Sequence, residues 1–217
     1  MNIALIRYLA ADAGRSQRWA APMLCFVILV AVLDAGGGSA LSCYGSTSAA
    51  MLAVSLWLTI VIAGSEDPFQ TAITVATVGS ATRVRLAKLA TAYLACVPLL
   101  ALGVLWPLVV GGHSASGTAV AAGLAAHLVT ALTGVGFGAL LSRPVLVHTA
   151  WAVVSGVAVC VAELAVPDFP PARQLLSLLG ADHPAHLAGS IALTAAQAVA
   201  LAVVTVAGAQ RIARTRV

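Results

Sequence analysis

The sequence predicts an all-α integral membrane protein with six transmembrane helices. Of the 217 residues, 61% are hydrophobic and only 8% are charged, whereas a soluble globular chain carries about 25% charged residues. The hydrophobic residues form runs of about 20, the length that crosses a bilayer as a helix, and these runs are too continuously apolar to be barrel strands. The predicted spans are residues 20–37, 47–65, 88–110, 118–141, 146–166 and 188–208.

Both termini are predicted to be cytoplasmic, because loops rich in Lys and Arg stay on the inner side of a membrane. In that orientation ten of the eleven basic residues fall inside and only Arg173 falls outside. The short basic clusters also argue against nucleic acid as a partner, since binding a phosphate backbone needs a continuous basic surface. An excess of Ala, and of Arg over Lys, is typical of GC-rich bacterial genomes and favours the plasma membrane.

Residues 2–18 are predicted to form an amphipathic helix that lies in the lipid headgroup layer. At about 100° per residue, the apolar side chains gather on one side and the basic ones on the other. The apolar side comprises Ile3, Ile6, Leu9, Ala10 and Ala13, and the basic side comprises Arg7, Arg15 and Arg18. The alternative is an unstructured basic tail. The next connection, residues 35–46, is rich in Gly and Ser and predicts a flexible outer loop.

Residues 66–79, between the second and third spans, predict a short capped helix on the cytoplasmic side. Asp67 is a suitable N-cap for a helix that begins at Pro68, and Gln70 stands where it completes a capping box. Gly79 is a natural terminator. A second helix start follows at Ser80, after which come three basic residues that are expected to extend toward the headgroups, namely Arg83, Arg85 and Lys88.

An apolar stripe runs along this short helix at helical spacing. It consists of Phe69, Ala72, Ile73 and Ala76. Because a connection between two spans needs only a few polar residues, a structured segment here favours a docking surface for another protein. The alternative is a segment that packs under the bundle or buries its stripe in lipid.

The connection at residues 167–187 contains a second short helix. Pro167, Pro170 and Pro171 end the fifth span, and the leucines that follow make an apolar helix that Gly180 terminates. This helix is too short to cross a membrane, so it is expected to lie on the outer face or dip into it, as a lid over the space between the spans.

Two ionisable residues within the spans are candidates for a translocation path, because charge at membrane depth is costly. His127 lies near the middle of the fourth span, where the alternative is a neutral imidazole bonded to a neighbouring helix. Glu163 lies about one turn from the outer end of the fifth span, where the alternative is simple solvation. Asp34 lies about as shallow in the first span, and for it too a place lining the outer vestibule and simple solvation are the two alternatives. The spacing of Gly134 and Gly138 in the fourth span predicts close helix packing.

The sequence carries no motif for nucleotide hydrolysis or for a membrane hydrolase. Its four cysteines include no C-x-x-C pair, and three lie in apolar runs. They are therefore expected to be small buried hydrophobic residues, and neither a disulfide framework nor a zinc site is predicted. The pair His183 and His186 has a spacing that some metal sites use, but no matching Cys or carboxylate set accompanies it.

In the order of these parts, the chain resembles the short membrane subunits of type-2 ATP-binding-cassette (ABC) exporters. The likeness consists of the N-terminal amphipathic helix, six spans with both ends inside, and the cytoplasmic segment that runs from Ser65 through Gly79 to Lys88. It covers essentially the whole chain. In that family the helix after the second span is a coupling helix that inserts into a separate ATPase subunit, and the connection between spans five and six forms re-entrant outer helices. Here these would be residues 66–79 and 167–187.

The resemblance implies a permease subunit that forms a homodimer or heterodimer around a central path and is driven by a separate ABC ATPase subunit. ATP and Mg²⁺ would be held by that partner, so no cofactor, metal or catalytic residue is expected in this chain. The residues that the resemblance assigns to ATPase docking are Glu66, Asp67, Phe69, Gln70, Ile73, Gly79 and Arg83. The few charges in the spans favour a hydrophobic or amphiphilic cargo.

Two other functions stay open from the sequence. One is the substrate-capture subunit of a vitamin importer, which has about the same size but would need a dense polar pocket within its spans. The other is an accessory structural membrane protein, for which the capped cytoplasmic helix has no purpose. A stoichiometric ATPase subunit in a gently solubilised sample favours the exporter over both.

Overall fold

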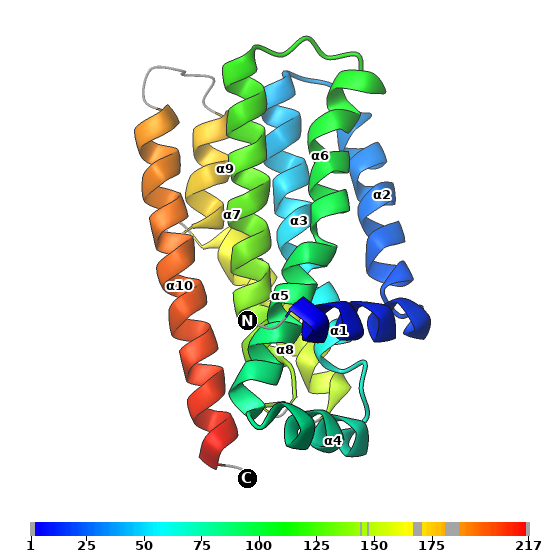
Figure 1. The fold of residues 1–217 in the computed structure, drawn as a ribbon. Helices are drawn as coiled ribbons and strands as arrows, with labels where there is room; N and C mark the ends of the chain where they lie inside the picture. Colours follow the sequence, from blue (N-terminus) through cyan, green and yellow to red (C-terminus); the bar gives the residue numbers. More distant parts are fainter. Residues whose placement is uncertain (1–2, 144, 147, 167–170, 181–186, 216–217) are drawn as a thin grey trace.

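A computed structural model describes residues 3–143, 145–146, 148–166, 171–180 and 187–215, and all regular structure in them is α-helical (Figure 1). The described elements are α1 (Ile3–Ser16), α2 (Ala20–Asp34), α3 (Ala40–Ala63), α4 (Pro68–Val78), α5 (Ala81–Ala95), α6 (Val97–Val109), α7 (Gly117–Leu141), α8 (Thr149–Ala165), α9 (Ala172–Gly180) and α10 (Leu187–Thr215). Most of them stand side by side as a bundle, while α1 and α4 lie across it. The all-helical fold class is therefore confirmed for the described residues.

Four helical segments in the described residues are long and apolar enough to cross a membrane, and the number rises to five if α1 and α2 count as one bent span. The four are α3, α5 together with α6, α7, and most of α10. Helices α1 and α2 meet at 78°, and α8 is apolar but shorter than the other candidates. The chain thus has the helices that a membrane protein requires, although fewer than six of them meet this length criterion.

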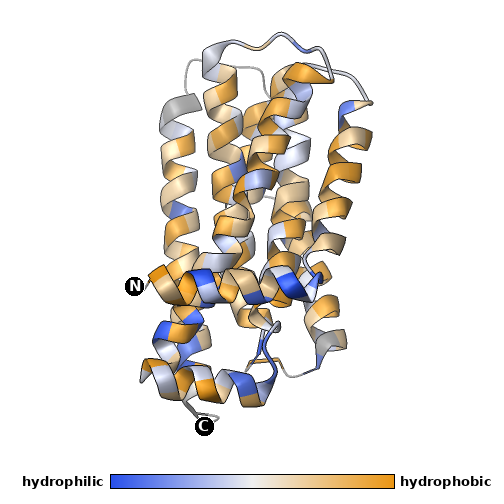
Figure 2. Cartoon of the chain, turned by 45° about the vertical axis from the view of Figure 1, so that its right-hand side comes forward, coloured by the Kyte–Doolittle hydropathy of each residue, from blue (hydrophilic) through white to orange (hydrophobic). Residues whose placement is uncertain are grey.

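Helix α3 is the centre of the bundle. It packs on α2, α5, α6, α7, α8 and α9, and its contact with α7 is the most extensive in the described chain. The main core lies around α3, where Val54 and Leu58 pack with Phe26 of α2 and Leu99 of α6. Many large apolar side chains point outward, which suits a lipid environment. Figure 2 shows that the upright helices are mainly hydrophobic, whereas hydrophilic residues are prominent on α1 and α4.

Glycines on α7 allow the close approach of α3, as the sequence predicted for Gly134 and Gly138. A Cβ at Gly138 would lie 2.5 Å from Thr59 Cβ, and one at Gly134 would collide with Ser55 Oγ. Gly136, on another side of α7, meets Ala202 and Thr205 of α10 in the same way. Without side chains at these positions the helix backbones come close enough for extensive van der Waals contact.

The helix boundaries agree with the predicted spans best at α7 and least well at α3. Helix α3 begins at Ala40 because Ser39 is its N-cap, with the Ser39 Oγ accepting from Ser42 N at 3.2 Å. The expectation of a flexible loop over residues 35–46 is therefore wrong for its second half. At Ser80 the predicted start is confirmed, since its hydroxyl accepts from Arg83 N at 3.3 Å and α5 follows.

The N-terminal segment is helical, but its buried side differs from the predicted apolar side. Leu5, Leu9 and Ala13 are buried. The first two pack against Val84 and Ala87 of α5. Ile3 and Ala10, which were expected on the same apolar side, are exposed. Part of the apolar surface of α1 is therefore used for packing on the protein, and its place in a headgroup layer stays a prediction.

Helix α9 is the part of the 167–187 connection that the structure describes, together with Pro171. Its Leu175 and Leu179 are fully buried and pack with Ala122 and Ala126 of α7 and Ala198 of α10. It stands alongside these helices within the bundle and does not lie across their ends (Figure 1). Residues 167–170 and 181–186, which include His183 and His186, lie outside the described residues.

Candidate functional site

The candidate site is built on α4, at the end of the bundle where α10 also ends (Figure 1). The capped helix predicted from the sequence is present. Asp67 Oδ1 accepts from Gln70 N at 2.8 Å, Pro68 opens the helix, and Gly79 closes it in the left-handed conformation at φ 72°. The side chain of Gln70 does not complete a capping box, because its Nε2 donates to Tyr8 OH of α1 at 2.9 Å.

One side of α4 is attached to the rest of the chain and the other faces away from it. Thr74 is buried, and Val75 and Val78 pack against the cluster formed by α1 and α5. The predicted apolar stripe lies on the opposite side, and all four of its residues are exposed. Phe69 is 76% exposed and Ile73 is 54% exposed. We call Phe69, Ala72, Ile73 and Ala76 the α4 stripe.

Glu66 lies under α4 and not on its exposed side. Its Oε2 forms an ion pair with Lys88 Nζ of α5 at 2.8 Å, and its side chain is fully buried. Thr74 Oγ1 donates to Glu66 Oε1 at 2.9 Å. Lys88 also approaches Thr71 Oγ1 at 3.3 Å and Ala63 O at 3.4 Å. The expectation that Lys88 extends toward the headgroups is therefore wrong, and Glu66 and Lys88 together attach α4 to α5.

The charge of Glu66 is maintained by this ion pair. Burial alone would raise the pKa of Glu66, but hydrogen bonds from Lys88, Thr74 and Tyr8 and the positive charge of Lys88 bring it below its ordinary value. An ionised carboxylate is thus the stable form at neutral pH.

The other predicted docking residues lie on the surface around the α4 stripe. Asp67 precedes the helix, Gly79 ends it, and Arg83 lies in the first turn of α5; all three are exposed. Gln70 is half-buried because its amide is bonded to α1. The structure therefore leaves Asp67, Phe69, Ile73, Gly79 and Arg83 exposed along α4 and at its two ends. Glu66 and Gln70 instead make contacts that hold α4 to α5 and α1.

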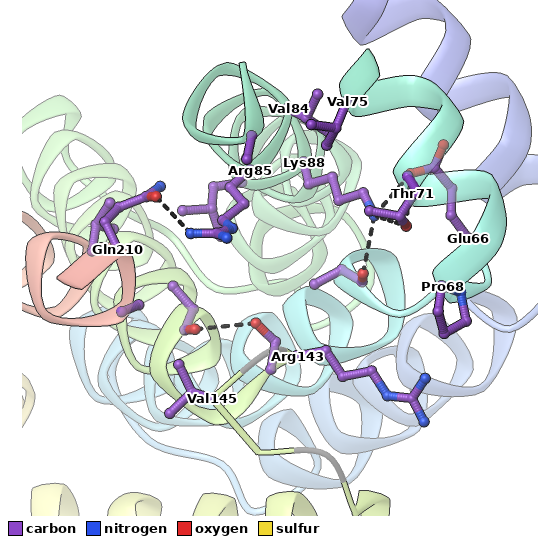
Figure 3. Close-up of a pocket in the computed structure, with 18 residues that line it drawn as sticks. Glu66, Pro68, Thr71, Val75, Val84, Arg85, Lys88, Arg143, Val145 and Gln210 are labelled. Carbon is purple, nitrogen blue, oxygen red and sulfur yellow. Dashed lines mark hydrogen bonds and ion pairs between the residues drawn. The ribbon is translucent and has the colours of Figure 1, made fainter. Parts of the chain in front are cut away.

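A cavity of about 590 Å³ lies beside α4, between the ends of α3, α5, α7 and α10 (Figure 3). Its walls are mainly apolar, with a few polar groups. Arg85 Nη1 donates to Gln210 Oε1 of α10 at 3.0 Å, and Figure 3 shows these two side chains reaching toward each other. Arg143, after α7, also lines the cavity. The hydrogen bond between Arg85 and Gln210 thus connects α5 with the last turns of α10.

A second groove of about 1090 Å³ runs along α3 and α8. Apolar residues such as Trp57, Val157 and Val161 line most of its length, and all three are exposed. Charged residues line it near α4, namely Arg18, Glu66, Asp67 and Arg143. A groove with apolar walls and a charged end matches a molecule that has an apolar body and a polar head.

His127 lies in the core of the bundle. It is fully buried, its Nδ1 is 2.7 Å from Gly123 O, and its Nε2 has no hydrogen-bond partner among the described residues. Gly103 of α6 and the ring of Tyr44 of α3 enclose it. His127 lines neither of the two cavities described here, and its bond to Gly123 is within its own helix, not to a neighbouring one.

Glu163 is also fully buried, so the alternative of simple solvation is wrong. Its Oε2 accepts from Ala172 N, the first N–H of α9, at 3.3 Å. A carboxylate at this position satisfies an N–H that has no partner within the helix. Glu163 therefore joins the end of α8 to the start of α9.

Sequence reasoning missed the supports of α4 because each comes from another part of the chain. Lys88 stands 22 residues after Glu66 in the sequence, and Tyr8 stands 62 residues before Gln70. The one available signal was that acidic residues, Glu66 and Asp67, end one apolar run and that the basic Lys88 begins the next. None of the family models, curated proteins or solved structures compared with the chain matches it.

Proposed function

We propose that this chain is the permease subunit of an ABC transporter, an exporter of an amphiphilic or hydrophobic substrate, driven by a separate ATPase subunit that docks on the α4 stripe. In this proposal α4 lies in the cytoplasm and the protein resides in a bacterial plasma membrane with both termini inside. The six crossings would be α2, α3, α5 with α6, α7, α8 and α10, with α9 as part of the re-entrant segment on the outer side. ATP and Mg²⁺ belong to the partner chain.

The observation that carries the proposal is the combination of exposure and attachment at α4. The α4 stripe offers an aromatic and an aliphatic anchor, Phe69 and Ile73, which are the residue types that fill pockets of a protein partner. The opposite side of the same helix is fixed by an ion pair, by hydrogen bonds and by apolar packing. A segment that only connected two spans would need neither feature.

Because α4 is attached to α5 and α1, a protein that docks on α4 could move these helices. A force applied to α4 reaches α5 through Glu66 and Lys88, and it reaches α1 through Gln70 and Tyr8. Helix α5 continues with α6 as one of the apolar segments long enough to cross a membrane. Movement of an ATPase subunit would therefore shift spans as rigid bodies, which is how a partner's nucleotide energy is converted into alternating access.

The groove along α3 and α8 supports the choice of cargo and the dimeric state. Its apolar walls are open on the isolated chain, and a second permease chain placed over it would enclose a central path. The charged residues at its α4 end suit the head of an amphiphile. The pair could be a homodimer or a heterodimer with a related chain.

The test truncates the α4 stripe. Phe69→Ala combined with Ile73→Ala is expected to weaken co-purification of the ATPase subunit, identified by its phosphate-binding loop, at least tenfold. The reason is that losing an anchor residue costs about 2 kcal/mol or more, and about 1.4 kcal/mol corresponds to a factor of ten. The measurement is the molar ratio of the two subunits after gentle solubilisation from native membranes.

The matched control is Thr77→Ala, which removes an exposed hydroxyl from the same helix and leaves the α4 stripe intact. It should retain the wild-type ratio. If the wild-type chain carries no ATPase subunit, or if the double variant retains it fully while remaining folded in the membrane, the docking role is refuted.

A further inference from the structure

Three metal-ligating side chains meet at the end of the bundle opposite α4, two of them nine residues apart and the third 70 residues further along the chain. Asp34 is the last residue of α2, Cys43 lies in the first turn of α3, and His113 lies in the connection between α6 and α7. One donor atom from each lies within 4.8 Å of the others. Asp34 and Cys43 are buried and His113 is partly exposed, so the donors form a pocket that opens to solvent on one side.

The distances fit a tetrahedral metal ion. His113 Nε2 lies 3.3 Å from Asp34 Oδ1 and 3.6 Å from Cys43 Sγ. Zinc bonds to nitrogen and oxygen are about 2.0–2.2 Å and those to sulfur about 2.3 Å, so tetrahedral angles place such ligand atoms about 3.4–3.6 Å apart. The two separations from His113 Nε2 therefore lie near those that a tetrahedral ion requires, and all three donor atoms lie within 4.8 Å of one another.

The arrangement is unsuited to a catalytic relay. In a Cys-His-Asp relay one ring nitrogen faces the thiol and the other faces the carboxylate. Here the same nitrogen, His113 Nε2, approaches both partners. Convergence of three donors around one point is the arrangement that a shared cation requires.

The surroundings of Asp34 give a second indication. Asp34 Oδ1 is buried and, although His113 Nε2 lies 3.3 Å away, it forms no hydrogen bond among the described residues, whereas burying a carboxylate is costly unless a cation or donors compensate it. The chain also passes directly over this carboxylate, because a Cβ at Gly111 would collide with Asp34 Oδ2. Gly112 then turns in the left-handed conformation at φ 65° and leads into His113.

We propose that Asp34, Cys43 and His113 bind one divalent transition-metal ion of the zinc class. Thiolate, imidazole and carboxylate together suit Zn²⁺ and exclude a preference for Mg²⁺ or Ca²⁺, which bind oxygen ligands. With three protein ligands the fourth position is open to water or a small ligand on the partly exposed side of His113. The ion would tie α2, α3 and the α6–α7 connection together.

The test uses the purified full-length chain in detergent, stripped with a chelator and titrated with Co²⁺. We expect one Co²⁺ per chain, a thiolate-to-cobalt charge-transfer band and the intense visible bands of four-coordinate Co²⁺, all abolished by excess Zn²⁺. Cys43→Ser should remove the charge-transfer band, and Asp34→Asn and His113→Gln should weaken binding at least tenfold. Cys25→Ser, a change at another cysteine outside the cluster, should leave the titration unchanged.

Two results with the variants would overturn the proposal. One is a charge-transfer band that persists in Cys43→Ser. The other is a loss of Co²⁺ binding in His183→Asn with His186→Asn, which would place the ion elsewhere. Zinc-edge X-ray absorption of the wild-type chain is a test that does not depend on whether the variants fold. The expected result is one sulfur at about 2.3 Å from the zinc, with nitrogen and oxygen as its other neighbours. A shell without sulfur would refute the assignment.

Discussion

At the scale of single residues, the buried pair of Glu66 and Lys88 determines how α4 sits on the bundle. Buried ion pairs contribute little net stability compared with apolar residues of similar volume, because both charges lose their hydration. Their effect is on geometry, since an unpaired member left in the same place is strongly unfavourable. The pair therefore fixes the position of α4 relative to α5 more than it stabilises the fold.

Lys88→Met is expected to destabilise the chain by about 3–5 kcal/mol, because it leaves the Glu66 carboxylate buried without its partner. Glu66→Gln with Lys88→Met should restore most of this loss, since no charge remains to be compensated. The measurement is the free energy of unfolding of the purified chain for the wild type, each single variant and the double variant. Additive effects of the two single changes would show that the residues do not interact.

The ion pair of Glu66 and Lys88 also makes the stability of the folded chain depend on pH. The pKa of Glu66 is lowered from its ordinary value of 4.5. At any pH above 4.5 the ion pair therefore makes its full contribution to the stability of the folded chain. The stabilisation is lost as the pH falls through the lowered pKa. The difference in stability between wild type and Glu66→Gln should therefore be constant near neutral pH and shrink in acid.

At the scale of the helices, the contact between α3 and α7 depends on glycines. Gly138→Ala would place a Cβ 2.5 Å from Thr59 Cβ and 3.0 Å from Leu56 O, a main-chain atom that cannot move aside cheaply. We expect a loss of about 1–3 kcal/mol, the usual cost of overpacking a core. Gly189→Ala on α10 is the control, because its Cβ would meet nothing within 4 Å. Equal thermal unfolding midpoints for the two variants would contradict the close approach of α3 and α7.

Helices whose limits depend on neighbouring residues were predictable from the sequence, as α4 shows. Asp67, Pro68 and Gly79 act within one or two turns, so their spacing gives the helix and its exposed stripe directly. The early start of α3 was missed because its first turns contain several Ser residues with Thr, Tyr and Gly, which lower the hydropathy although Ser39 supplies a cap.

Features that join distant segments were not predictable in the same way. His113 stands 70 residues after Cys43, and no local pattern indicates that the α6–α7 connection returns to the place where α2 ends and α3 begins. The burial of Glu163 was missed for a similar reason, because it depends on where α9 begins. Tertiary packing supplies these partners, and periodicity describes only one element at a time.

At the scale of the whole molecule, the proposed topology places α4 and the α6–α7 connection on opposite sides of the membrane. Cysteines introduced at Thr77 and Ser116, both exposed, test this with a membrane-impermeant maleimide. In intact cells Ser116→Cys should be labelled, whereas Thr77→Cys should be labelled only after permeabilisation. The wild-type chain gives the background of the native cysteines. Labelling of both variants in intact cells would contradict the topology.

The bend between α1 and α2 has a mechanical consequence for the proposed transporter. Helices α1 and α2 meet at 78°, and α1 is held to α4 by the bond between Tyr8 and Gln70. In the proposed transporter, a displacement of α4 would therefore be passed to α1, and the bend at residues 17–19 would pass it on to α2. Helix α1 would in this way receive the movement of α4, and α2 would transmit it to the far end of the bundle.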